Sequence, residues 1–131
     1  MIHFPSLIGV VAASVIAFGI GGLWFSPALF GNDWLKELHV GDRPVSRSTG
    51  ALLAIPAAVG SALILGILIE SIGSATPLKG VCIGFLIWLG FAVAIHLPAI
   101  YLEHAPRRFL IDAGHKLVVF VAMGAALGAW G

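Results

Sequence analysis

Long apolar stretches alternate with short polar segments along this chain of 131 residues. Four of the stretches are predominantly apolar, and they cover about residues 7–25, 51–69, 80–101 and 109–130. A helix needs about 20 such residues to cross the hydrocarbon core of a bilayer. The pattern therefore predicts an all-α fold, a bundle of four transmembrane helices that forms a single integral membrane domain over residues 1–131.

The most polar segment, residues 28–49, carries a weaker helical pattern. Apolar side chains recur there at roughly helical spacing, at Leu29, Phe30, Trp34, Leu35 and Leu38. Asp33, Lys36 and Glu37 occupy other faces. This arrangement is typical of a short amphipathic helix at the membrane interface, between the first and second spans. The alternative is an ordered loop with a few apolar anchors.

Small residues recur at every fourth position in the first two spans. The row in the first span consists of Gly9, Ala13, Ala17 and Gly21. The row in the second span consists of Gly50, Ala54, Ala58, Ala62 and Gly66. Lipid tails are as apolar as leucine, so helices associate in a bilayer through close contact, which small residues permit. We therefore expect these two helices to pack along their rows, and small-residue faces to join helices within one chain or between chains.

Shorter pairs with the same spacing occur in the last two spans. Gly80 precedes Gly84 in the third span, and Gly124 precedes Gly128 in the fourth. Each pair permits close approach of a neighbouring helix, although a single pair is a weaker signal than a row of five.

The basic residues predict how the chain is oriented in the membrane. Most of them lie in the two connecting segments on one side of the bundle: Lys36, Arg43, Arg47, Arg107 and Arg108. The connecting segment on the other side has only Lys79. Connecting segments rich in Lys and Arg stay in the cytoplasm. We therefore expect a multi-pass protein of the cell membrane with both termini outside the cytoplasm.

The composition narrows the class of partner. The chain is 60% hydrophobic and only 10% charged, whereas a soluble domain carries about 25% charged residues. Its net charge of +1 lacks the basic excess that recognition of nucleic acid requires. We therefore expect the protein to lie in a lipid bilayer and not to bind nucleic acid. The single cysteine, Cys82, cannot form an internal disulfide.

Ionisable residues gather around the turn between the last two spans, and such residues in or near a span are functional candidates. The candidate polar or ligand site consists of His96, Glu103, Arg107, Arg108, Asp112 and His115. His96 and His115 lie nearly equally far from the turn, at a shared depth of roughly 14 Å. We expect them to face each other inside the bundle, with Asp112 or Glu103 within hydrogen-bonding reach. An unpartnered polar group in hydrocarbon costs several kcal/mol, which inward-facing histidines would avoid.

Two interpretations of this cluster stay open. In the structural one, Arg108 pairs with Asp112, and Glu103 with Arg107 fastens the turn. In the functional one, the cluster is a proton relay, a lipid-headgroup site, or a metal or haem site at the two histidines. The sequence has no His-x-x-x-His pair, no pair of cysteines and no nucleophile in a recognisable frame. We therefore expect no metal, no cofactor and no catalytic residue.

Two short segments resemble each other within the chain. The sequence F-S-P-A-L-F at residues 25–30 aligns with H-L-P-A-I-Y at residues 96–101, so that Pro27 matches Pro98. This match predicts two hairpins related by a parallel repeat, with similar kinks near both prolines. A chance match is the alternative.

The segment G-L-W-F-S-P-A-L-F-G-N-D-W at residues 22–34 resembles the opening signature of a family of small bacterial integral membrane proteins, the domain of unknown function 1761. The tail is similar too, with Glu103, then F-L-I-D-A-G-H at residues 109–115, then the closing stretch at residues 124–130. The resemblance covers essentially the whole chain. It implies four spans and a membrane location, and it implies no activity.

These features predict a small polytopic protein of the bacterial inner membrane that is non-catalytic and associates with itself or with a membrane-protein partner. The alternative is a small transporter or channel-like protein, which would move protons or a polar solute through the His, Glu and Asp side chains at the cytoplasmic end.

Overall fold

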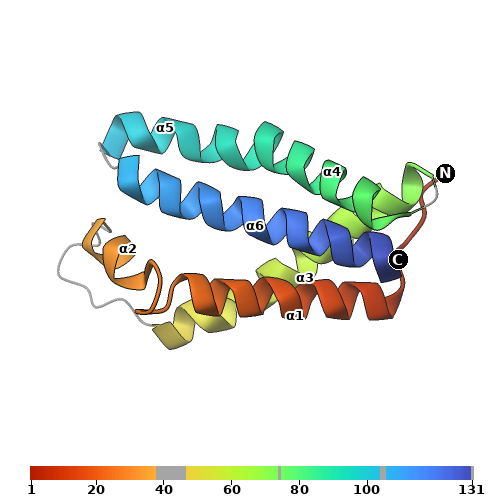
Figure 1. Ribbon diagram of the computed structural model, residues 1–131, viewed down its shortest axis with the longest axis horizontal. Helices are drawn as coiled ribbons and strands as arrows, with labels where there is room; N and C mark the ends of the chain where they lie inside the picture. Colours follow the sequence, from red (N-terminus) through yellow and green to blue (C-terminus); the bar gives the residue numbers. More distant parts are fainter. Residues whose placement is uncertain (38–46, 74, 104–105, 131) are drawn as a thin grey trace.

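The computed structural model describes residues 1–37, 47–73, 75–103 and 106–130, and these residues form helices joined by short turns (Figure 1). The elements in chain order are α1 (Leu7–Trp24), α2 (Gly31–Glu37), α3 (Arg47–Ser71), α4 (Pro77–Ile87), the π-helix η1 (Trp88–Ala92), α5 (Val93–Glu103) and α6 (Pro106–Trp130). The predicted all-α class is confirmed. The third span is the continuous rod formed by α4, η1 and α5.

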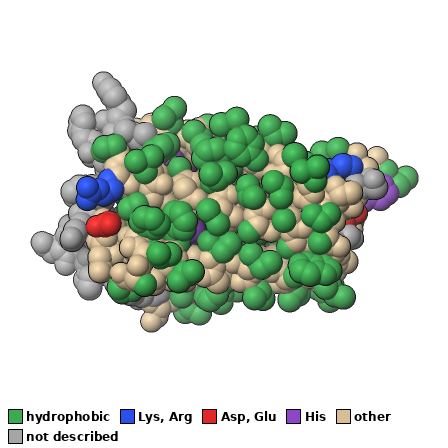
Figure 2. Space-filling view, viewed as in Figure 1, with side chains coloured by type: hydrophobic (Ala, Val, Ile, Leu, Met, Phe, Trp, Pro, Cys, Tyr) green, Lys and Arg blue, Asp and Glu red, His purple; other side chains and the backbone are tan. Residues whose placement is uncertain are grey.

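Among the described residues, four helices are long and apolar enough to cross a membrane, as predicted. They cover Leu7–Trp24, Ser48–Ser71, Pro77–Pro98 and Pro106–Trp130. Figure 2 shows hydrophobic side chains over the middle of one face and charged side chains only towards its two ends. Large apolar side chains such as Leu52 and Ile95 are about 70% exposed, at 68% and 72%. Such a surface suits hydrocarbon, and by length and composition the chain is a multi-pass membrane protein.

Local chemistry sets where the helices begin. The hydroxyl of Ser6 accepts a hydrogen bond from the Gly9 amide and caps α1. Thr76 does the same for α4 through the Lys79 amide, so the third span begins at Pro77 rather than near residue 80. Both caps satisfy amides that the first turn of a helix leaves without a partner. The last span likewise begins earlier than predicted, at Pro106, because proline is well suited to the first turn.

The closest helix contact joins α4 and α6, and glycines make it possible. A Cβ atom on Gly80 would overlap the carbonyl oxygen of Gly124, and a Cβ on Gly84 would overlap that of Phe120. A Cβ on Gly128 would overlap the carbonyl oxygen of Thr76 in the same way. The shorter glycine pairs therefore bring two backbones into direct contact, as close association in a membrane requires.

The small-residue row of α1 packs into the bundle, where Gly9, Ala13 and Ala17 are buried. At both ends the row lies against α6. A Cβ on Gly9 would stand 3.3 Å from the carbonyl oxygen of Trp130, and a Cβ on Gly21 would stand 3.5 Å from Nε2 of His115. Thus α1 packs on α6 as well as on α3, whereas the sequence indicated α3 alone.

The row of α3 is covered only in its second half. Ala62 and Gly66 are buried, and Ala58 is partly buried against the core. Gly50 and Ala54 are exposed, and a Cβ on Gly50 would meet nothing within 4 Å. Figure 1 shows the reason: α3 crosses the other helices obliquely, and its first half, which contains Pro56, leaves the bundle.

The helices bring the two chain termini to one end of the bundle, which we call the termini end (Figure 1). There the Ser6 hydroxyl donates to the Trp130 carbonyl oxygen, and the His3 amide donates to Ser71 Oγ at 2.9 Å. The opposite end carries α2 and the start of α6 with Arg107 and Arg108, and we call it the basic end.

The two segments that match in sequence adopt different structures. Residues 25–30 form a turn after α1, whereas residues 96–101 continue a helix. Pro27 follows the end of a helix, but Pro98 lies inside α5. The predicted similarity of the two proline regions is therefore wrong at the level of local structure.

Candidate functional site

Three tryptophans are joined to three consecutive residues of α6 near the basic end. The indole N–H of Trp24 donates to the Ile111 carbonyl oxygen at 3.1 Å. That of Trp34 donates to Asp112 Oδ1 at 2.9 Å, and that of Trp88 donates to the Ala113 carbonyl oxygen at 2.7 Å. An indole N–H in a bilayer needs an acceptor, and a helical carbonyl has a second lone pair to offer. One turn of α6 therefore fixes α1, α2 and η1.

A tight turn returns α2 to the bundle so that Trp34 can reach Asp112. The Phe30 amide donates to the Trp24 carbonyl oxygen at 3.0 Å, and the Gly31 amide donates to that of Ser26 at 3.0 Å. A Cβ on Gly31 would overlap the Phe25 carbonyl oxygen, so this close reversal requires glycine. A short helix is thus present in this segment at Gly31–Glu37, and its Trp34 indole contacts the bundle. Its predicted location at the membrane interface stays a prediction.

The Asp112 carboxylate is the centre of the polar contacts at this end. Besides the Trp34 indole, it pairs with Arg108, whose Nε lies 3.6 Å from Oδ2. The His96 side chain on α5 is near enough to interact electrostatically with the same carboxylate. The structural interpretation of Arg108 and Asp112 therefore agrees with the geometry, and the pair is only partly exposed, at 26% and 19%.

His115 faces α1 rather than His96. Its ring centroid lies 4.8 Å from that of Phe25 and 6.2 Å from that of Trp24. Equal depth along the bundle was not sufficient for the two histidines to meet, because α6 presents His115 towards α1 while His96 approaches Asp112 from α5. The expectation that the two histidines face each other is wrong.

The Nε2 atom of His115 is buried, and no described residue offers it a hydrogen bond. An unsatisfied buried nitrogen is unusual in a folded protein and costs about 1–3 kcal/mol. Gly21 lies beside it, and a Cβ on Gly21 would stand 3.5 Å from Nε2, an ordinary contact distance. Among the buried side-chain atoms of the candidate site that the structure describes, this nitrogen is the one without a hydrogen-bond partner.

A comparison with protein families assigns the chain. A family model described as "Protein of unknown function (DUF1761)" matches residues 8–128. The chain belongs to the DUF1761 family. No curated protein and no solved structure matches it. The family description names no activity, so the function of this DUF1761 protein has to be argued from its geometry.

The other predicted site residues occupy less central positions. Arg107 is exposed in the first turn of α6. Glu103 is the last residue of α5, and its side chain lies outside what the structure describes. The structure thus brings together Arg108 and Asp112, and it places His115 one turn further along α6 in a separate aromatic environment.

The three tryptophans are the site residues that sequence reasoning missed. Trp34 was predicted only as an apolar residue of the short helix, and Trp24 and Trp88 carried no assigned role at the site. The sequence did carry a signal for them: each indole has one N–H donor, and inside a bilayer no water is available to accept its hydrogen bond. The sequence does not identify the acceptors, since two of them are backbone atoms of α6.

The polar groups at this end can bind a ligand or exchange a proton. Among the described residues, no three His, Cys, Asp and Glu side chains group closely enough to hold a metal ion. On the side towards the termini end, the site is followed by fully buried apolar side chains, Ile69, Met123 and Leu127, each 0% exposed. Buried apolar side chains therefore lie between the polar groups of the basic end and the termini end.

Proposed function

We propose that this DUF1761 protein is a non-catalytic protein of the bacterial inner membrane that works by associating with a second copy of itself. The observation that carries this proposal is the exposed first half of α3. Its residues 48–57 are all exposed, although most are apolar and several are small. A stretch of helix that the other described helices leave exposed, and that carries small residues, is suited to contact another helix in the bilayer.

The contact would use the part of the α3 row that the bundle leaves uncovered. Gly50 and Ala54 stand one turn apart on one face, and nothing lies within 4 Å of a Cβ built on Gly50. Two copies of α3 that cross at these residues would bring their backbones close together. In hydrocarbon, such packing is the main source of helix association.

The apolar layer below the candidate site supports a binding role over conduction. A conducted proton or solute needs polar groups across the whole membrane. Here Ile69, Met123 and Leu127 fill the interior between His115 and the termini end, and each is fully buried.

The orientation in the membrane is part of the proposal. The Lys and Arg residues at the basic end support a cytoplasmic location for that end, with both termini outside.

The oligomeric state in lipid tests the proposal. The wild-type protein, reconstituted in lipid nanodiscs and cross-linked, is expected to give a dimer. Gly50→Leu with Ala54→Leu is expected to give a monomer with unchanged helix content, because both side chains are exposed. Gly19→Leu is the matched control, since Gly19 is an exposed glycine of α1 with open space around it. A monomeric wild type, or a dimer that survives the α3 substitutions, would contradict the proposal.

The alternative function, movement of protons or a polar solute through the histidines and carboxylates, has one observation in its favour. The unsatisfied Nε2 of His115 can accept a proton or a hydrogen bond from a bound molecule. Proton flux into vesicles that contain the purified protein tests this candidate. A flux that His115→Phe removes would favour transport over association.

A further inference from the structure

The aromatic rings beside His115 form a cover of two layers. The inner layer consists of Trp24 and Phe25, whose ring centroids lie 6.2 Å and 4.8 Å from that of His115. The outer layer consists of Phe30 and Trp34. The ring of Phe30 lies 4.7 Å from that of Trp24, and the ring of Trp34 lies 5.2 Å from that of Phe25. Each outer ring therefore contacts an inner ring, and the outer rings belong to the turn after α1 and to α2.

The outer layer lies on the side of the basic end. Trp34 donates to Asp112, which precedes His115 by three residues on α6 and is therefore about 4.5 Å nearer to the start of that helix. Figure 1 shows α2 at this end of the molecule, beyond the last turn of α1. The turn and α2 thus lie between His115 and the basic end on the side that α1 covers.

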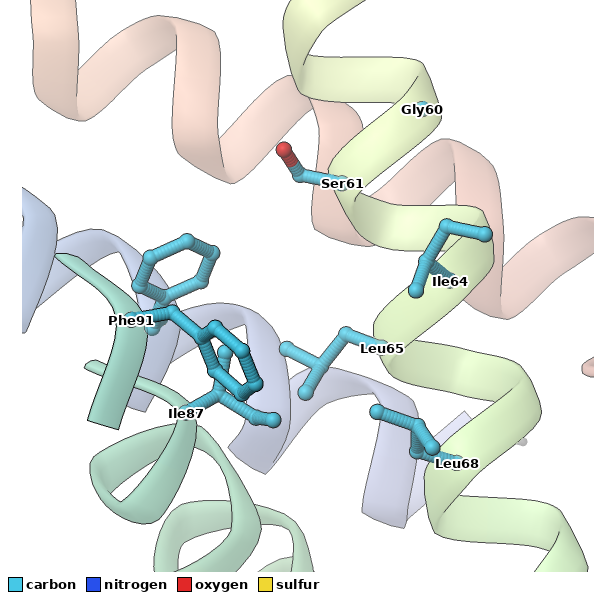
Figure 3. Close-up of a pocket in the computed structure, with 8 residues that line it drawn as sticks. Gly60, Ser61, Ile64, Leu65, Leu68, Ile87 and Phe91 are labelled. Atoms are coloured by element: carbon cyan, nitrogen blue, oxygen red, sulfur yellow. The ribbon is translucent and has the colours of Figure 1, made fainter. Parts of the chain in front are cut away.

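The groove on another side of the bundle does not lead to His115. It opens between α3 and the third span (Figure 3), where Leu65 faces Ile87 and Phe91. Its lining is apolar apart from Ser61, and it contains neither His115 nor a residue of α1 or α2. Towards the termini end, His115 is followed by the fully buried apolar layer. The basic end is therefore the side from which water has the shortest way to this histidine.

Two opposing contributions determine how firmly α2 stays in place. The hydrogen bond of Trp34 to the Asp112 carboxylate holds α2 against α6. The Nε2 atom of His115, in contrast, is buried without a hydrogen-bond partner among the described residues, and hydration would remove this cost. A hydrogen bond to a charged group and an unsatisfied buried nitrogen have free energies of the same order. The release of α2 therefore costs less than the loss of the Trp34 bond alone.

We propose that α2 is a gate over His115, closed in this structure, and that its release admits a water molecule from the basic end to Nε2. Water is the ligand that satisfies buried polar atoms which protein groups leave without a partner. Gly21, the α1 residue beside Nε2, has no side chain that could take this role. Protons reach a buried imidazole through such a water, so the gate would control when His115 exchanges a proton. The gate does not depend on self-association, because none of its residues belongs to α3.

Solid-state NMR of the histidine-labelled protein in lipid bilayers tests the gate by measuring magnetisation transfer from water to each imidazole ring. The resonance of His115 is identified by its loss in His115→Phe. In the wild type, transfer to His115 should be slow and transfer to the exposed His3 fast. Trp34→Phe removes a hydrogen bond to a carboxylate and should raise the population of the open gate about tenfold or more, so transfer to His115 becomes faster. Trp34→Ala also removes the ring contact with Phe25 and should have a larger effect.

Trp88→Phe is the matched control. It removes another indole hydrogen bond to α6, the bond of 2.7 Å to the Ala113 carbonyl oxygen, but Trp88 is not part of the cover. Transfer to His115 should therefore stay slow in this variant. The proposal would be overturned by wild-type transfer to His115 as fast as to His3, or by unchanged transfer in folded Trp34→Ala. An equal increase in Trp88→Phe would also overturn it, since this would mean a general loosening of the bundle.

Discussion

The indole of Trp34 donates a hydrogen bond of 2.9 Å to the carboxylate of Asp112, and this bond attaches the short helix α2 to α6. The two residues are 78 positions apart in the chain. The ring of Trp34 also lies 5.2 Å from that of Phe25, so the indole contacts both the turn after α1 and the start of α6. Trp34 thus holds α2 in position both as a hydrogen-bond donor to Asp112 and as an apolar contact of Phe25.

Trp34→Phe is expected to release α2 while the four spans stay folded. The substitution keeps a ring beside Phe25 but leaves a lone pair of Asp112 without its donor, at a cost of about 1–3 kcal/mol. Hydrogen exchange of the amides in residues 31–37 should become faster, and thermal stability in detergent should fall. Trp130→Phe is the control, because Trp130 is 54% exposed. Unchanged exchange in residues 31–37 would show that the bond does not hold α2.

Gly84→Ala is expected to destabilise the protein by separating α4 from α6. The added methyl group would overlap the carbonyl oxygen of Phe120, and overpacking of this kind typically costs about 1–3 kcal/mol. Gly22→Ala, where nothing lies within 4 Å, should be neutral or stabilising by up to about 1 kcal/mol through helix propensity. Thermal unfolding in detergent compares the two. Equal stability of both variants would count against direct backbone contact.

His115→Phe is expected to stabilise the protein. It retains an aromatic ring against Phe25 and removes the buried nitrogen that lacks a partner, a gain of about 1–3 kcal/mol. His96→Phe should act in the opposite direction, since His96 lies near the Asp112 carboxylate. A lower unfolding temperature for His115→Phe would indicate that Nε2 is satisfied by an ordered water. A more stable variant that loses activity in cells would mark His115 as functional.

Cysteine labelling tests the proposed orientation after Cys82 is replaced by serine. Ile2→Cys lies at the termini end and should react with a membrane-impermeant maleimide in intact cells. Ser48→Cys lies near the basic end and should react only after the cells are opened. Both positions are exposed, so reactivity reports the side of the membrane. The reverse pattern would show that both termini are in the cytoplasm.

The number and type of the helices could be predicted from the sequence, because hydropathy alone determines which segments can cross a membrane. The contacts between helices were harder to predict, because a small residue that faces lipid and one that faces a helix look the same in the sequence. Gly50 and Gly84 illustrate this: the longer row contains Gly50, which has open space, whereas the shorter pair contains Gly84, which contacts a backbone.

At the candidate site, the sequence predicts the depth of a side chain in the bundle but not the direction in which its helix turns it. It placed Arg108 next to Asp112, because a separation of four residues on a helix is a contact. It could not say that His115 would turn towards Phe25, since that depends on how α1 lies around α6. The π-turn at Trp88–Ala92 was not predicted either, because it does not alter the hydropathy of the span that contains it.

The contact of α1 with α6 has a consequence for how the chain is made. The Ser6 hydroxyl that caps α1 is bonded to Trp130, which is 124 residues later. At roughly 5–20 residues per second, a ribosome needs about 6–25 s to produce that intervening length. During this time the glycine and alanine face of α1 has lipid or the insertion machinery beside it instead of α6. Because lipid does not repel such a face, α1 can wait in the bilayer without penalty, and the fold closes only when its last helix arrives.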